Sequence, residues 1–197
     1  LNTIFIKCPK CNKIFQTIEM LSGNTFGAVF YSDGFLAAPM YKNQQLLLKC
    51  TNCNSFFWLN DNKIELDKST NQFNDYDYNL SINDYIKFLN ENNNLTDQQE
   101  LFIRHQIRWL YNHDYRNKNI ELKLDSFQID NLNKLLLLYQ RLLGKDDFLL
   151  NKADILRNLS LFDKAENAIL KIKHIKSPYI LKLLNAIKQK NNSILEI

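Results

Sequence analysis

Apolar and polar positions alternate in the first third of the chain, which is the period of a half-buried strand. Four short apolar-rich runs, at 4–6, 13–18, 46–49 and 56–59, indicate strands. Between the second and third runs, two β-rich segments, 25–31 and 35–41, flank the turn signal Ser32-Asp33-Gly34. Since proline cannot donate to a strand ladder, Pro39 should lie at an edge or end of its strand. The pattern predicts a small antiparallel sheet with an inserted hairpin.

From Ser81 onward the apolar positions recur every three to four residues, the period of an amphipathic helix. Residues 60–80 before it are polar and read as a linker. Helix start and stop signals recur along the rest of the chain. They are Ser81 with Asp84, Thr96 with Gln99, Asp125 with Gln128, Gly144, Asp163 with Glu166, and Ser177 before Pro178. The pattern predicts helices over 82–92, 97–115, 126–143, 147–159, 163–175 and 178–190.

The four cysteines form two Cys-x-x-Cys pairs, Cys8 with Cys11 and Cys50 with Cys53, separated by 38 residues. A two-residue gap lets both thiolates of a tight turn face one ion, and two such turns complete a tetrahedral shell of four sulfurs. We expect one structural zinc ion per chain, bound by these four residues. The spacer exceeds the usual length for such a ribbon, so the ribbon must carry an insertion, whose glycine-bearing part at 22–34 has no assigned role.

Three other uses of four cysteines remain open. Two disulfides are disfavoured in a reducing compartment. A thioredoxin-like site needs one Cys-x-x-Cys at a strand-to-helix junction, and iron–sulfur clusters commonly use other spacings. Lysines 7, 10, 13 and 49 surround the two pairs, where they can stabilise thiolates or bind phosphate.

These patterns predict an α+β protein, with a small antiparallel four-cysteine zinc-ribbon β domain followed by an all-α domain of helical hairpins. The expected boundaries are 1–66 for the ribbon with its inserted hairpin, 67–80 for the linker and 81–197 for the helical domain. The surplus aromatic residues of the first segment are expected to pack against helices; the alternatives are a partner groove or a platform on which nucleic-acid bases stack. They are Phe26, Phe30, Tyr31, Phe35, Tyr41, Phe56, Phe57 and Trp58.

Part of the helical segment resembles a tetratricopeptide repeat (TPR). The residues that carry the resemblance are Leu149, Ala153, Leu156, the run Phe162-Asp163-Lys164-Ala165, Ile169, Ile172 and Pro178. The chain departs from the repeat at Leu149, where the family has Trp, and at Lys152-Ala153, where it has Leu-Gly. The whole chain also resembles uncharacterised bacterial proteins in which a Cys-x-x-Cys ribbon precedes TPR-like helices. The resemblance implies architecture, and no defined activity.

Net charge is +4, but its distribution is uneven: +2 over residues 1–66, −4 over 67–130 and +6 over 131–197. Lysines on the last helices fit solvated helix faces better than a nucleic-acid surface. A nucleic-acid-binding ribbon is nevertheless the alternative function, because lysines surround the cysteines. Arg104, Arg108 and Trp109 are the candidate functional surface patch, although pairing with acidic residues in 67–100 is favoured for the two arginines.

Catalysis is the least favoured function class. The chain has no HExxH, GxSxG, Walker or Rossmann pattern, and a zinc ion closed by four cysteines has no position for a substrate water. The remaining candidates are His105 and His113 with Asp114, Glu100 or Arg104. No run approaches the roughly 18 apolar residues of a membrane span, and no signal peptide is visible, so a cytoplasmic location is expected. We expect a non-enzymatic zinc ribbon coupled to a helical module for an unidentified protein partner.

Overall fold

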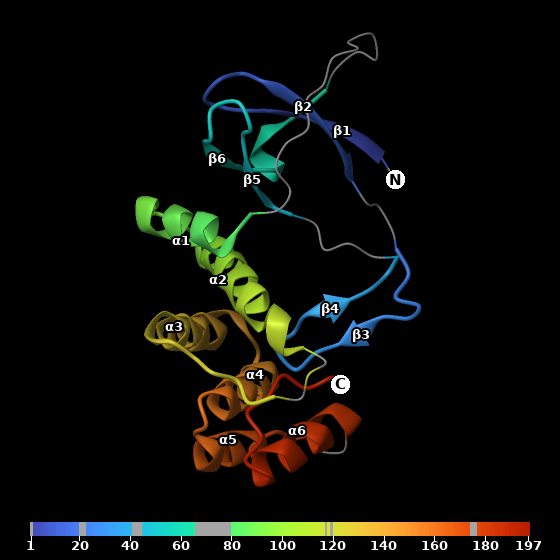
Figure 1. Ribbon diagram of the computed structural model, residues 1–197, viewed down its shortest axis with the longest axis vertical. Helices are drawn as coiled ribbons and strands as arrows, with labels where there is room; N and C mark the ends of the chain where they lie inside the picture. Colours follow the sequence, from blue (N-terminus) through green and yellow to red (C-terminus); the bar gives the residue numbers. More distant parts are fainter. Residues whose placement is uncertain are drawn as a thin grey trace. The chain divides into compact units, whose positions relative to one another are not determined.

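The computed structural model describes residues 2–19, 23–40, 45–65, 80–116, 118, 120–173 and 177–197. Internal contacts divide the chain into two compact units (Figure 1). The first, called the cysteine unit below, comprises Leu1–Ala28 and Ala38–Asp84, and the second, the helical unit, comprises Val29–Ala37 and Tyr85–Ile197. The predicted linker 67–80 lies outside the described residues apart from Leu80, as do Ser22, Tyr41 and His174.

The cysteine unit is built from short antiparallel strands. Strand β1 (Asn2–Lys7) pairs with β2 (Ile14–Glu19) on one side and with β7 (Lys63–Ile64) on the other. Strand β5 (Leu47–Lys49) pairs with β6 (Phe56–Trp58), and a 3-10 turn η1 (Asn60–Asn62) leads into β7. The predicted antiparallel strand region is thus present, but as separate sheets, with β7 in a segment whose polar sequence did not indicate a strand.

The core of the cysteine unit forms because buried and exposed side chains alternate along strands β1 and β2. Ile6 and Phe15 face each other across β1 and β2 and are fully buried, while their neighbours Lys7 and Gln16 are exposed. The same core contains Leu48, Cys50, Phe57, Leu59 and Cys8. Two of the cysteines therefore belong to the hydrophobic core, so a change at either one acts on packing and on metal chemistry together.

The inserted hairpin is shorter than its sequence indicates. Its strands are β3 (Val29–Phe30) and β4 (Leu36–Ala37), and they belong to the helical unit. The expected first strand begins late because residues 24–27 form a turn, in which the Phe26 amide donates to Asn24 Oδ1 and Gly27 has a φ of 71°. Phe26 is therefore exposed rather than buried in an interface.

Six helices follow in the described residues, as the periodicity predicts. They are α1 (Ile82–Glu91), α2 (Asp97–Asn112), α3 (Ser126–Leu142), α4 (Lys145–Asn158), α5 (Phe162–Ile169) and α6 (Pro178–Lys188), with a 3-10 turn η2 (His113–Tyr115) after α2. From α2 onward each helix packs against the next one along the chain. None of the described helices has the length and apolarity that crossing a membrane requires.

Helix starts follow the predicted caps at most positions. Thr96 and Asp125 each form a full capping box, with Gln99 and Gln128 respectively. The cap expected at Asp163 is wrong: α5 begins one residue earlier, after Leu161, and has no side-chain cap. The Leu161 amide instead donates to the Leu156 carbonyl at 2.8 Å, so the tight turn between α4 and α5 satisfies the backbone there.

Candidate metal centre

Each Cys-x-x-Cys pair lies in the turn of a β-hairpin, and the two turns have the same backbone bonds. In the first, the Cys8 amide donates to the Lys13 carbonyl at 2.9 Å and the Asn12 amide donates to the Cys8 carbonyl at 3.0 Å. In the second, the Cys50 amide donates to Ser55 at 2.9 Å and the Asn54 amide donates to Cys50 at 2.8 Å. The strands β1–β2 and β5–β6 therefore present two equivalent knuckles.

Both knuckles close on an asparagine in the left-handed region. Asn12 has a φ of 60° and Asn54 a φ of 57°. Asparagine tolerates this conformation better than most residues with a side chain. The pattern Cys-x-x-Cys-Asn occurs twice in the printed sequence, so this second repeated signal was available beside the cysteine spacing.

The four sulfurs converge on one point. The Sγ atoms of Cys8, Cys11, Cys50 and Cys53 all lie within 4.8 Å of one another. The Cys8–Cys53 distance is 3.7 Å and the Cys11–Cys50 distance is 3.6 Å. A regular tetrahedron with a metal–sulfur distance of about 2.3 Å has edges of about 3.8 Å. A disulfide would require about 2.05 Å, and all four cysteines are free. The arrangement can hold a metal ion.

Hydrogen bonds to the sulfurs differ between the buried and the accessible cysteines. The Ser55 hydroxyl, followed by the Ser55 amide, lowers the pKa of Cys53 to about 6. The Asn52 side chain, followed by the Lys13 amide, lowers the pKa of Cys11. Burial raises the pKa of Cys50 to about 12. Since a bound divalent cation deprotonates its thiol ligands outright, ion binding would overcome the cost of ionising the buried Cys50 thiol.

Two residues that sequence reasoning missed connect the knuckles. Ser55 Oγ lies 3.0 Å from Cys53 Sγ and 3.4 Å from Cys8 Sγ, so it contacts one sulfur of each turn. Asn52 lies in the second knuckle and bonds Cys11 in the first. Polar groups bonded to ligand atoms fix the orientation of those ligands and tune the metal. In the sequence, the position of Ser55 and Asn52 two residues after a cysteine is the only indication of this role, and such a spacing is common.

The lysines near the knuckles do not act as a single group. The Lys49 ammonium donates to the Asp84 carboxylate at 2.8 Å and lies 5.8 Å from the centre of the Phe56 ring. The charge of Lys49 is therefore paired with Asp84, whereas the sequence indicated that Lys49 would stabilise the cysteine thiolates. Lys7, Lys10 and Lys13 are exposed, and Lys13 contributes its backbone amide to the site.

No protein-family model, curated protein or solved structure matches this chain. The assignment of the centre therefore rests on the chemistry of its own residues.

A second polar assembly lies inside the helical unit, and it overturns the idea of an arginine surface patch. Arg108 is 4% exposed and donates to Asp154 at 2.7 Å and to Asn158 at 2.8 Å. Asp154 also accepts from Arg157, which is fully buried, at 2.6 Å. Arg104 pairs with Glu100 at 2.6 Å, as expected from the acidic segment. Arg108 faces inward because its carboxylate partner is on α4, not in 67–100.

The turn of the β3–β4 hairpin joins this assembly. Asp33 Oδ2 accepts from Arg116 at 2.6 Å and from Asn112 at 2.8 Å, and the Asp33 carbonyl accepts from Trp109 Nε1 at 3.0 Å. The Arg116 guanidinium also lies 4.0 Å from the centre of the Phe35 ring. Trp109 thus holds the turn and is not an exposed patch residue. The buried bonds explain why residues 29–37 fold with the helices.

The candidate acid–base residues are not assembled into one site. Burial, followed by the charge of Arg108, lowers the pKa of His105 to about 3, and its Nε2 lies 2.8 Å from Tyr139 Oη. His105, which is partly buried, is therefore neutral at neutral pH. His113 and Asp114 are exposed in η2. They lie nine or more residues beyond Arg104 and Glu100, at least about 13 Å along a helix.

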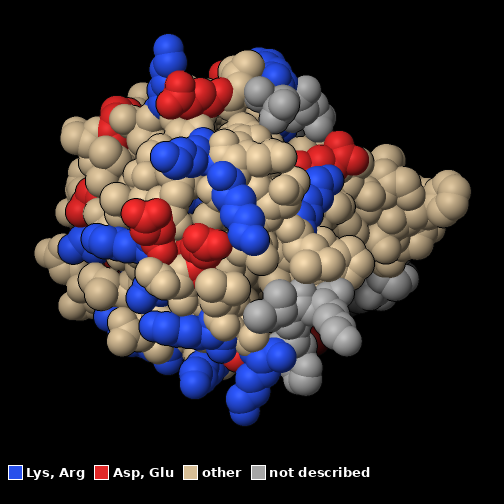
Figure 2. All heavy atoms as spheres, turned by 90° about the horizontal axis from the view of Figure 1, so that it is seen from below, with Lys and Arg blue, Asp and Glu red and all other residues tan. Residues whose placement is uncertain are grey.

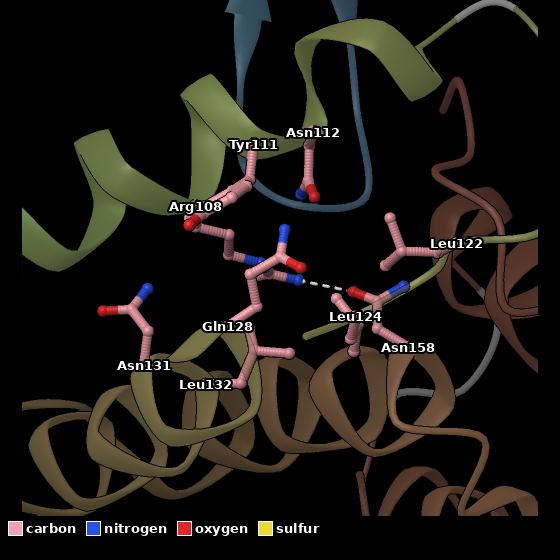
Figure 3. Close-up of a pocket in the computed structure, with 9 residues that line it drawn as sticks. All are labelled: Arg108, Tyr111, Asn112, Leu122, Leu124, Gln128, Asn131, Leu132 and Asn158. Carbon is pink, nitrogen blue, oxygen red and sulfur yellow. Dashed lines mark hydrogen bonds between the residues drawn. The ribbon is translucent and has the colours of Figure 1, made fainter. Parts of the chain in front are cut away.

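Two hollows in the helical unit have no histidine in their linings. The first, of about 10 Å³, is bounded by Arg108 and by amide side chains from α2, α3 and α4 (Figure 3). Its size admits about one water molecule. The second, of about 270 Å³, is an open polar groove beside the α1–α2 connection, lined partly by the Glu100–Arg104 pair. The second groove also has Asp130 in its lining.

Proposed function

We propose that this chain is a non-enzymatic zinc-binding protein, in which Cys8, Cys11, Cys50 and Cys53 hold one structural zinc ion per chain. The observation that carries the proposal is the pair of equivalent knuckles, whose four sulfurs all lie within 4.8 Å of one another, with two of the distances close to a tetrahedral edge. Four thiolates suit zinc, and they leave no coordination position for a substrate. The same thiols require a reducing compartment, which supports a cytoplasmic location.

Metal analysis of the purified chain tests this proposal directly. We expect one zinc per chain by elemental analysis and by native mass spectrometry, lost on denaturation in a chelator. Cobalt substitution should give the visible absorption of a tetrahedral tetrathiolate site. An iron–sulfur spectrum, or substoichiometric metal with two disulfides in freshly reduced protein, would contradict the assignment.

Replacing Ser55 with alanine should weaken metal binding without removing a ligand. The hydroxyl contacts the sulfurs of Cys53 and Cys8, and loss of such a ligand-orienting group typically costs 10–100-fold in metal affinity. We expect about tenfold weaker binding in competition with a chromophoric chelator. Lys10→Ala is the matched control, because Lys10 is exposed within the first knuckle, and its affinity should be unchanged. Equal affinities of Ser55→Ala and wild type would contradict the role of the hydroxyl.

We propose further that the helical part, 81–197 together with the hairpin at 29–37, is TPR-like and binds a protein partner, with the rest of 1–66 as the ribbon and 67–80 as the linker. The apolar residues that carry the resemblance support this, because they share one buried cluster, with Phe162 packed against it: Leu149, Ala153, Leu156, Ala165, Ile169 and Ile172. Ala153 and Ala165 are fully buried, as close packing of two helices requires. Leu170 and Leu181 are about half exposed and offer apolar contacts to a partner. Affinity capture of a defined partner, lost in Leu170→Glu/Leu181→Glu, tests this.

Nucleic-acid binding by the ribbon is the second candidate. It is favoured by the exposed Lys7, Lys10 and Lys13 around the first knuckle. Figure 2 views the molecule from the side on which Figure 1 draws α5 and α6; on this face basic and acidic side chains are interspersed, and the view says nothing of the lysines of the first knuckle. Binding that weakens steeply with salt would support this candidate, and no binding to RNA or DNA at about 50 mM salt would remove it.

A further inference from the structure

The four cysteines fall into two classes by exposure. Cys8 and Cys50, the first cysteine of each knuckle, have no exposed surface. Cys11 and Cys53, the second cysteine of each knuckle, are partly exposed. A dissolved reagent can therefore reach one sulfur of each knuckle and not the other.

The short sulfur contacts join the two classes across the knuckles. Cys53 Sγ lies 3.7 Å from Cys8 Sγ, and Cys11 Sγ lies 3.6 Å from Cys50 Sγ. Each contact pairs an accessible sulfur of one knuckle with a buried sulfur of the other. Both pairs need to shorten by less than 2 Å to reach a disulfide bond length of about 2.05 Å.

We propose that this centre is a peroxide-sensitive modification site, in which oxidation forms the cross-knuckle disulfides Cys8–Cys53 and Cys11–Cys50 and releases the metal. The release of metal rests on the proposed zinc site, whereas the disulfide pairing rests on the sulfur positions alone. The oxidant is hydrogen peroxide or an organic hydroperoxide.

The chemistry balances in two steps for each pair. The accessible sulfur attacks a peroxide oxygen, the O–O bond breaks, and a sulfenic acid forms, while the leaving hydroxide takes a proton and becomes water or, from an organic hydroperoxide, the leaving alkoxide takes a proton and becomes an alcohol. The buried sulfur then attacks the sulfenic sulfur, the S–S bond forms, the S–O bond breaks, and water leaves. Each disulfide thus gives two electrons to one peroxide, and thiolate ligands draw the required protons from solvent. Two peroxides oxidise one centre.

Cross-knuckle pairing has a structural consequence that pairing within a knuckle lacks. The two links join residues 45 and 39 positions apart, so the β1–β2 and β5–β6 hairpins stay attached after the metal leaves. Disulfides within Cys8–Cys11 and Cys50–Cys53 would leave the hairpins unconnected. The oxidised cysteine unit should therefore remain folded, unlike the reduced unit without metal.

The test treats the metal-loaded full chain with hydrogen peroxide and follows metal release with a chromophoric chelator. We expect one metal released per two peroxides, reversal by a thiol reductant with added zinc, and hydrogen-exchange protection of β1, β2, β5 and β6 in the oxidised form. Disulfides are assigned by mass spectrometry under non-reducing conditions. Trypsin cleaves after Lys10 and so separates Cys8 from Cys11, and peptide fragmentation distinguishes Cys50 from Cys53.

Two outcomes overturn the proposal. One is pairing within the knuckles, and the other is sulfinic acid at Cys11 and Cys53 with neither disulfide formed. Failure of the zinc assignment gives a different result. If protein purified without metal still forms Cys8–Cys53 and Cys11–Cys50, the zinc assignment is contradicted and the disulfide proposal stands. If zinc-loaded protein forms disulfides within each knuckle, the disulfide proposal is contradicted and the zinc assignment stands.

Discussion

Removing the metal from reduced protein is expected to unfold the cysteine unit and to leave the helical unit folded. The cysteine unit has short strands and a small core that includes Cys8 and Cys50. Without an ion, the small apolar area that this core buries gives the unit little hydrophobic stabilisation. Structural zinc contributes about 10–16 kcal/mol in small zinc-binding peptides, which is as large as the whole stability of a typical domain. The helical unit has its own hydrophobic clusters and no cysteine.

Hydrogen exchange followed by mass spectrometry measures this result segment by segment. With a chelator and a reductant present, peptides from 2–19 and 45–65 should exchange as unfolded chain, while peptides from α2 to α6 keep their protection. Cys50→Ser should reproduce the effect without chelator, and exposed Lys10→Ala, between two ligands, should not. Protection of both units after complete metal removal would show that the ion does not hold the fold.

Replacing Asp154 with alanine is expected to be the most damaging single change in the helical unit. This 1% exposed carboxylate accepts from both Arg108 and Arg157, so its loss leaves two buried guanidinium groups without a counter-charge. Removing one partner of a buried ion pair typically costs about 3–5 kcal/mol. We expect a loss of about that size in the urea unfolding free energy of the helical transition, followed by circular dichroism.

Asp147→Ala is the matched control for this change. Asp147 lies on the same helix, α4, but is exposed in its first turn, where its favourable position relative to the helix dipole is worth about 0.5 kcal/mol. The expected order is a small loss for Asp147→Ala and a loss several times larger for Asp154→Ala. Equal losses of stability in the two variants would mean that water, and not Asp154, stabilises the positive charges of the buried arginines.

The features that sequence predicted well are those decided within a few residues. Thr96 and Gln99 are three positions apart, and their reciprocal cap marks the start of α2. Each cysteine knuckle is likewise a local turn, so spacing alone indicated that its two thiols face one point. Helix periods of 3.6 residues placed the six helices for the same reason.

The features that sequence missed depend on partners far along the chain. The sequence indicates Arg108 as a surface residue of a helix because arginine is rarely buried without a partner, and no local pattern marks Arg116 as buried. Their partners, Asp154 and Asp33, are 46 and 83 residues away, and no local pattern links them. For the same reason the hairpin at 29–37 was assigned to the ribbon, although its buried turn bonds it to α2 and η2.

The hairpin that packs in the helical unit also determines when that unit can finish folding during synthesis. The Ser32 amide donates to the Leu195 carbonyl at 2.9 Å, and the Ile197 amide donates to the Phe30 carbonyl at 2.7 Å. At about 5–20 residues per second, the ribosome needs roughly 10–30 s after residue 32 to deliver residue 197. For the first part of that interval the carboxylate of Asp33 has no ion-pair partner, because Arg116 is synthesised 83 residues later. The two knuckles of the cysteine unit end at Ser55 and are synthesised first, so an ion held by the four cysteines would be bound before the helical core is complete.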